Sequence, residues 1–229
     1  MLKLIKLEWK KNNVARSIRA ACIMTAVLTL FVTAMAGELH DEMPMELYGK
    51  SMIDATVDIF AHISWIIFTG VMLAIYIVGA YETKTMNLMF SYQIHRKKIL
   101  FSKMLAVWVF NFCGLAAGKL LMYGTLFLMK PYTRVTVVDI PLGTAEFWLK
   151  LFLGSAAMVS ITFIALPIGL KFRSTKSTID AAVIITLFTQ GNIGSFSLAG
   201  SIPFYVLLFI LAAVSVVAAV YDVETKDVM

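Results

Sequence analysis

The sequence predicts an all-α polytopic membrane protein whose chain crosses the bilayer six times. Hydrophobic residues make up 60% of the 229 residues, the mean hydropathy is +0.84, and charged residues make up only 15%. These values lie outside the range of soluble globular domains. Apolar runs, each long enough to cross roughly 30 Å of hydrocarbon as a helix, alternate with polar segments. They cover residues 20–36, 59–80, 104–129, 148–170, 178–198 and 202–221, so we treat 1–229 as a single transmembrane domain.

The distribution of charge predicts the orientation of these spans. Of the 20 Lys and Arg residues, 15 lie in the polar segments 1–19, 81–103 and 171–176 or after residue 221. Segment 37–58 instead holds six acidic residues against Lys50 alone. Basic loops stay on the cytoplasmic side, so both termini are expected there and 37–58 outside. Because the net charge of +6 is dispersed between apolar runs, it does not indicate binding to nucleic acid.

The first segment, 1–19, is basic and amphipathic, with apolar residues at helical spacing. It predicts a helix that lies in the headgroup plane with its lysines toward anionic lipid; the alternative is a charged leader that only orients the first span. Ala34-Met35-Ala36 before Gly37 resembles a signal-peptidase site. A long leader and five further spans favour an uncleaved first helix.

The loop at 81–103 holds five basic residues against one acid, Glu82. Thr83 or Thr85 can cap a short helix, and Met86, Met89 and Phe90 then fall on one face. An exposed apolar face of this kind favours a docking element for a partner. The alternative is a solvated turn whose charges only set the topology, with Glu82 paired to Lys84.

The later spans contain three irregular features. In 104–129, Gly114 and Gly118 form a small-xxx-small face that lets helices approach closely, and Asn111 offers a nearby polar contact. In 178–198, Gln190 and Asn192 interrupt the apolar pattern, which predicts either one distorted helix or a helix followed by a re-entrant piece. Irregular backbone at that depth is covered by protein or faces water, so both residues are candidates for a substrate path.

Lys119 is the formal charge that lies well inside a span. A lysine buried in a membrane is costly and often functional, which makes Lys119 a further candidate for the substrate path. It lies about two-thirds of the way along 104–129, however, so it can also snorkel to the outer interface. Both interpretations stay open from the sequence.

Enzymatic chemistry is not indicated. Gly114 to Lys119 is one residue shorter than a phosphate-binding loop, and no Ser or Thr follows the lysine. No nucleophile–base pair or carboxylate dyad is visible. His40, His62 and His95 are isolated, and Cys22 and Cys113 lie inside apolar runs as reduced packing residues, so we expect no metal and no bound cofactor.

The order of these motifs is similar to that of one transporter family. The leader carries Leu7-Glu8-Trp9-Lys10, and the second span ends in Glu82; Thr85, Leu88-Met89, His95-Arg96 and Lys103 then follow. This order resembles the permease subunits of type-2 class ABC exporters, especially small bacterial ones linked to export of, or immunity to, lantibiotics and other antimicrobial peptides. The topology covers the whole chain, and the motifs cover about residues 1–19 and 81–105. Lys84 stands where the family has glycine, and Gln93 roughly where it has proline.

The resemblance implies a division of labour. A separate ATPase subunit binds ATP, a second permease copy or paralogue completes the complex, and the whole lies in the bacterial cytoplasmic membrane. The leader contacts the ATPase, and a coupling helix in the loop between the second and third spans transmits its movement. The implied coupling positions are Glu82, Thr85, Met89, Arg96 and Lys103, with Met86 and Phe90 added by the apolar face.

The expected function is therefore ATP-driven export of an amphipathic or hydrophobic substrate. A peptide is favoured; a lipid or a small hydrophobic drug is the alternative. The acidic segment 37–58 could attract cationic peptides, although the positive-inside rule alone leaves outer loops poor in basic residues. A stand-alone channel or ion-coupled carrier would need ionisable residues clustered within the membrane, and Lys119 is the one candidate. An intramembrane enzyme would need paired catalytic side chains.

Overall fold

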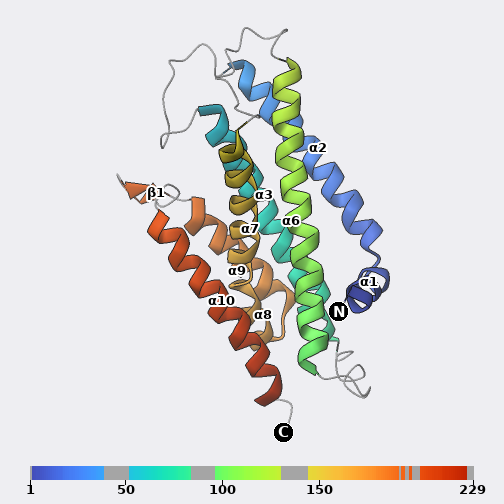
Figure 1. The fold of residues 1–229 in the computed structure, drawn as a ribbon. Helices are drawn as coiled ribbons and strands as arrows, with labels where there is room; N and C mark the ends of the chain where they lie inside the picture. The colour runs from blue at the N-terminus through green and yellow to red at the C-terminus, as the bar shows by residue number, and fades with distance from the viewer. Residues whose placement is uncertain are drawn as a thin grey trace.

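A computed structural model gives the chain as a bundle of helices that run side by side along one axis (Figure 1). Apart from two very short strands, the described residues are almost wholly helical. The structure describes residues 2–38, 52–83, 96–129, 144–190, 192–193, 196–197 and 202–225. The elements are α1 (Leu2–Lys11), α2 (Val14–Glu38), α3 (Met52–Leu73), the π-helix η1 (Ala74–Val78), α4 (Gly79–Glu82), α6 (Arg96–Met129), α7 (Ala145–Thr162), α8 (Ala165–Phe172), α9 (Thr175–Gln190), β1 (Asn192–Ile193), β2 (Phe196–Ser197) and α10 (Ile202–Thr225).

Four helical segments are long and apolar enough to cross a membrane, as judged over the described residues. They are Val14–Met35, Asp54–Glu82, Lys98–Met129 and Phe147–Phe172, and a shorter apolar stretch covers Val206–Val220. The prediction of an all-helical chain with several membrane-length apolar helices is confirmed. We call the end of the bundle that carries α1 the α1 end; it is the lower end in Figure 1.

The N-terminal segment differs from the single helix expected over 1–19. α1 ends at Lys11, and α2 begins at Val14, six residues before the first predicted span. Asn13 makes the turn between them with a left-handed φ of 55°. Asparagine tolerates this conformation better than most residues do. It therefore allows α1 to end and α2 to begin in a new direction at this point.

The polar segment 81–103 is largely helical where it is described. α4 ends at Glu82, where both the amide and the hydroxyl of Thr83 donate to the carbonyl oxygen of Gly79. α6 begins at Arg96, so Lys103 belongs to the helix rather than to a loop before it. The short helix expected around Met86, Met89 and Phe90 lies outside the described residues.

The fourth and fifth predicted spans both contain a break. α7 ends at Thr162 and α8 begins at Ala165. Pro167 has no amide hydrogen to give to the carbonyl oxygen of Phe163, which accepts from the Leu166 amide at 3.1 Å instead. α9 ends at Gln190, and β1 and β2 pair antiparallel with Asn192 opposite Ser197, so the structure has a helix followed by non-helical chain over 178–198.

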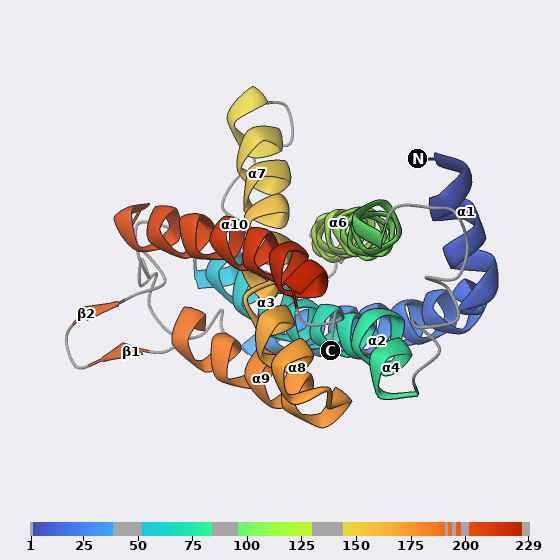
Figure 2. The ribbon, with the colours of Figure 1, turned by 90° about the horizontal axis from the view of Figure 1, so that it is seen from below.

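The core lies where α3 meets α6, α7 and α9. Small residues permit the closest approaches: a β-carbon at Gly70 would overlap Ala182 on α9, and one at Gly169 would overlap Thr178. α2, α9 and α10 expose many large apolar side chains, as helices in lipid do. Seen along the bundle, α1 lies at its edge, outside α6 (Figure 2).

Candidate functional site

A buried ion pair joins α1 to α6 at the α1 end. Lys103 Nζ lies 2.7 Å from Glu8 Oε2, and the two side chains are only 1% and 9% exposed. The ammonium also donates to the carbonyl oxygen of Tyr76 at 3.2 Å, and Asn12 Nδ2 donates to Glu8 Oε2 at 3.3 Å. The mutual attraction of the two charges and these further hydrogen bonds offset part of the cost of removing both groups from water.

Further hydrogen bonds hold the N-terminal helices in place. Trp9 Nε1 donates to the carbonyl oxygen of Ala106 at 3.2 Å. Ser17 Oγ lies 3.2 Å from the hydroxyl of Tyr76, which connects the start of α2 to η1. Since Lys103 and Ala106 lie three residues apart on one face of α6, α1 crosses that face with Glu8 and Trp9 turned inward.

The contact at Tyr76 falls within a π-helical turn. The amide of Gly79 bonds the carbonyl oxygen of Ala74, five residues earlier, so this part of the second apolar segment is locally wider than an α-helix. Such turns interrupt the regular ladder and are frequent at functional sites. Lys103 therefore binds the second apolar segment at its irregular turn.

Glu82 connects the end of α4 to the start of α9. Its Oε2 accepts from the backbone amide of Thr175 at 3.2 Å. A carboxylate at this position satisfies one of the unpaired amides of a helix N-terminus and complements its dipole. The alternative partner suggested by the sequence, Lys84, lies outside the described residues.

The implied coupling positions are thus only partly described. Lys103 turns into the bundle, Glu82 contacts α9, and Arg96 is the first residue of α6. Thr85, Met86, Met89 and Phe90 lie outside the described residues. Sequence reasoning missed Glu8 as the partner of Lys103, although a single acid on the inner face of a basic helix was an available signal.

A second charged cluster lies between α3 and α6, toward the opposite end of the bundle. Lys119 Nζ is 2.8 Å from Asp58 Oδ1 and 2.8 Å from His62 Nε2. One turn further along α6, Tyr123 is hydrogen-bonded to Asp54. A charged lysine only donates, and the role of His62 Nε2 in this contact depends on the tautomer of the ring.

This cluster changes the interpretation of two residues. Lys119 is 3% exposed and points into the bundle, not toward the outer interface. From the sequence we interpreted His62 as isolated, but its ring contacts Lys119, and the residue is only 8% exposed. Asp58 and His62 lie one turn apart, so both reach the same lysine. That spacing was the signal that sequence reasoning did not use.

Gly114 and Gly118 of α6 pack against the side chain of Trp65 on α3. A β-carbon at Gly114 would overlap the Trp65 ring, and one at Gly118 would lie 3.3 Å from Trp65 Nε1. Asn111 Nδ2 donates to the carbonyl oxygen of Val107 at 2.8 Å and contacts Met72 Sδ at 3.4 Å. The small-xxx-small face thus accommodates the 1%-exposed Trp65 of the same chain.

Substituting Gly114 with Ala is expected to destabilise the protein by about 1–3 kcal/mol, because overpacking forces Trp65 or the α6 backbone to shift. Gly124 on the same helix has nothing within 4 Å of the corresponding β-carbon. Gly124→Ala is therefore the matched control and should leave stability unchanged or raise it slightly. Thermal unfolding in one detergent compares the two. Equal midpoints would show that Trp65 does not need Gly114.

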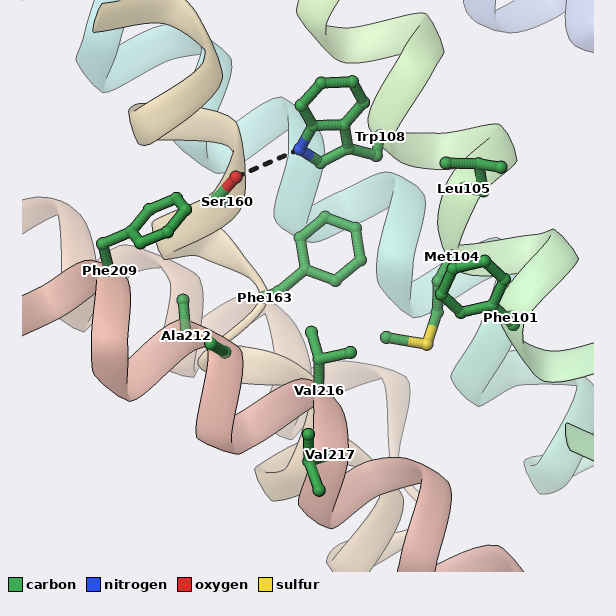
Figure 3. Close-up of a pocket in the computed structure, with 11 residues that line it drawn as sticks. Phe101, Met104, Leu105, Trp108, Ser160, Phe163, Phe209, Ala212, Val216 and Val217 are labelled. Atoms are coloured by element: carbon green, nitrogen blue, oxygen red, sulfur yellow. Dashed lines mark hydrogen bonds between the residues drawn. The ribbon is translucent and has the colours of Figure 1, made fainter. Parts of the chain in front are cut away.

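One lateral groove lies between α6, α7 and α10 (Figure 3), and we call it the α6–α10 groove. It encloses about 510 Å³. Trp108 Nε1 donates to Ser160 Oγ at 3.1 Å, so the indole N–H already has a hydrogen-bond partner in the wall of the groove. The other lining side chains are apolar and include Phe101, Met104, Phe163, Phe209, Val216 and Val217.

The second lateral groove, the α2–α6 groove, lies on the other side of α6 and encloses about 890 Å³. Cys22 and Cys113 line it as free thiols, as expected, and both are exposed on the surface of the bundle. Among the described side chains, neither Lys119 nor Gln190 lines either groove, and the side chain of Asn192 lies outside the described part of the structure. Within the described residues, no group of His, Cys, Asp and Glu could hold a metal ion.

Comparison with known proteins yields one distant relative. Over 200 residues the chain is 20% identical to the uncharacterized protein YcbO of Bacillus subtilis (strain 168), and the match covers 86% of this chain and 87% of that protein. No protein-family profile matches the chain. No solved structure matches it either.

Proposed function

We propose that this chain is the permease subunit of a type-2 class ATP-driven exporter, with ATP hydrolysed by a separate subunit. The observation that carries the proposal is the buried pair of Glu8 and Lys103. These residues belong to the two segments on which the family resemblance depends, and 95 positions separate them in the sequence. Their pairing supports a role in which the leader and the start of the third span move together.

The contacts at the α1 end suggest how movement would pass to the membrane helices. An ATPase that displaced α1 would act on α6 through Glu8 and Trp9, and on η1 through Lys103 and the Tyr76 carbonyl oxygen. Glu82 would pass the same movement to α9 through the Thr175 amide. No catalytic side chain is required of this chain for such a role.

We propose six membrane crossings, formed by α2, α3 with η1 and α4, α6, α7 with α8, α9, and α10. Exposed basic residues at the α1 end favour a cytoplasmic position for that end. Among the described residues they include Lys10, Arg16, Arg19, Lys98, Lys171, Arg173 and Lys176. Both termini would then lie inside a bacterial cell, and a second permease copy or paralogue would complete the transmembrane complex.

The apolar wall of the α6–α10 groove supports an amphipathic or hydrophobic substrate. Aromatic and branched side chains make contact area without offering charges, which suits the apolar face of a peptide. We favour a peptide, such as an antimicrobial peptide whose export gives resistance or immunity. A lipid or a small hydrophobic drug is the alternative for the same groove.

A second candidate function is an ion-coupled carrier. The cluster of Lys119, Asp58 and His62 provides buried ionisable residues between membrane helices, as such carriers require. Against this, Asp58 and Lys119 already neutralise each other, and neither groove reaches Lys119. We therefore place the carrier second.

Co-purification with an ATPase tests the proposal. Replacing Met89 and Phe90 with Asp should leave insertion intact but weaken association at least about tenfold, since each buried apolar side chain contributes on the order of 1–3 kcal/mol at an interface. Thr144→Asp, at the opposite end, is the control and should not affect association. A complex that hydrolyses ATP and loses its ATPase only in the Met89/Phe90 variant is the expected result.

Two outcomes would contradict the exporter. One is unchanged ATPase association and ATP-dependent export in the Met89/Phe90 variant, which would remove the coupling role. The other is substrate movement in vesicles that contain this chain alone, driven by a proton gradient without ATP, which would favour the carrier.

A further inference from the structure

The α2–α6 groove has the length and lining of a site for a hydrocarbon chain. On α6 its lining runs from Val109 to Thr125, which corresponds to about 24 Å at 1.5 Å per residue and therefore to most of the roughly 30 Å hydrocarbon layer. Trp65, Gly114 and Gly118 form part of the lining, and both glycines pack against the indole ring without a side chain that would narrow the groove.

The threonine hydroxyl groups that line the groove already have hydrogen-bond partners within their own helices, so an occupant does not need to supply any. Thr25 Oγ1 donates to the carbonyl oxygen of Ala21 at 2.8 Å, and Thr29 Oγ1 donates to that of Thr25 at 2.8 Å. On the opposite wall, Thr125 Oγ1 donates to the carbonyl oxygen of Met122 at 2.9 Å. An occupant therefore meets paired hydroxyl groups together with aliphatic and aromatic surface along the groove, which suits an acyl chain.

One exposed arginine, Arg19 of α2, lies beside the α1 end of this groove. Trp9 lines the groove there. Residues 19, 22, 26 and 30 share one face of a helix, and Cys22, Ala26 and Leu30 all line the groove. Arg19 is not itself part of the lining, but by helical spacing it lies beside Cys22 and Ala26, close to the helix start. From there its long cationic side chain can reach a headgroup while its stem stays in apolar surroundings.

We propose that the α2–α6 groove is a binding site for an anionic phospholipid, with an acyl chain along α6 and the phosphate at Arg19. A second copy of this chain is a poorer occupant. Two copies with the same orientation in a membrane would meet across a two-fold axis, so their Arg19 side chains would face each other at the same depth and repel. The site does not depend on the proposed exporter function.

The test uses Trp65 as a reporter of the groove. A variant with Trp9, Trp108 and Trp148 replaced by Phe retains Trp65, and a second variant retains only Trp108, which lines the α6–α10 groove. Each is reconstituted in vesicles of phosphatidylcholine and phosphatidylglycerol at one fixed ratio. The bromine atoms that quench tryptophan fluorescence are placed on the chains of one lipid or of the other.

Brominated phosphatidylglycerol is expected to quench Trp65 in preference to brominated phosphatidylcholine, with an apparent affinity ratio of about fivefold, as one basic residue near an anionic lipid provides. Trp108 should show no such preference. Arg19→Gln should abolish the preference at Trp65. Arg16→Gln removes the same charge from an exposed residue whose helix face, with Ile23 and Val27, does not line the groove, and it should retain the preference.

Three results would overturn the proposal, provided that the thermal midpoints of the variants match. Equal quenching of Trp65 by both lipids would mean that the groove holds bulk hydrocarbon without selection. Equal loss of the preference in Arg16→Gln and Arg19→Gln would indicate general attraction to the basic end. No quenching of Trp65 by either lipid would mean that another protein surface, such as a second copy, covers the groove.

Discussion

Glu8→Gln is expected to destabilise the protein by about 3–5 kcal/mol, since it removes one partner from a buried ion pair and leaves the other charge uncompensated. The remaining charge belongs to Lys103, whose side chain is 1% exposed and cannot reach water in this structure. We expect α1 to detach from α6 so that Lys103 becomes solvated. A lower thermal midpoint and faster proteolysis within residues 1–13 would report this detachment.

The double variant Glu8→Gln with Lys103→Met provides the control. It removes both charges and keeps the side-chain volumes similar, so most of the lost stability should return. Asn12→Ala should cost less, about 1.5–3 kcal/mol, because it removes hydrogen bonds to the carboxylate and the carbonyl oxygen of Glu8 but leaves the ion pair in place. A thermal midpoint of Glu8→Gln within a degree of the wild-type value would show that the ion pair does not hold α1.

Asp58→Asn is expected to have a similarly large effect at the other charged cluster, about 3–5 kcal/mol, because it leaves Lys119 buried without its counter-charge. Lys119→Met should cost less. The Asp58 side chain is 20% exposed, whereas that of Lys119 is 3% exposed, so the carboxylate left behind can still be hydrated. The order of the two thermal midpoints checks this expectation.

Transport by the double variant Asp58→Asn with Lys119→Met separates the two candidate functions. This variant should recover stability, since no uncompensated charge remains in the bundle. If the chain belongs to an ATP-driven exporter, the double variant should retain ATP-dependent export, because neither groove is lined by these residues. Loss of transport from a stable, assembled double variant would place Lys119 on the substrate or ion path.

The helical membrane class was predictable because lipid offers no partners to the backbone. A single apolar run of membrane length can then pair all of its backbone N–H and C=O groups within itself only as a helix. The ends of the helices were less predictable. By composition, residues 96–103 were assigned to the polar loop, but they form the first turns of α6, where Lys103 pairs with Glu8 and Lys98 is exposed.

Pairs between helices were predictable only in part. Gly114 and Gly118 indicated a close approach, but no pattern in the sequence names Trp65 as the side chain that occupies it. Asp58 and His62 at one-turn spacing, and Lys119 and Tyr123 at the same spacing, did carry a signal. It was missed because Asp58 was assigned to the preceding loop and His62 was considered alone.

The π-turn at Ala74–Val78 has a consequence for the direction in which Glu82 points. A turn closed by the Ala74 carbonyl oxygen and the Gly79 amide contains one residue more than a regular α-helical turn. Removing that residue from the turn would rotate everything after it by about 100° and shift it by about 1.5 Å along the axis, since these are the steps of one helical residue. The extra residue of the π-turn therefore sets the direction in which Glu82 points toward Thr175, and a regular α-helical turn at this place would direct it elsewhere. Lys103 binds the Tyr76 carbonyl oxygen within this turn, so its ammonium group stabilises the observed conformation of the turn.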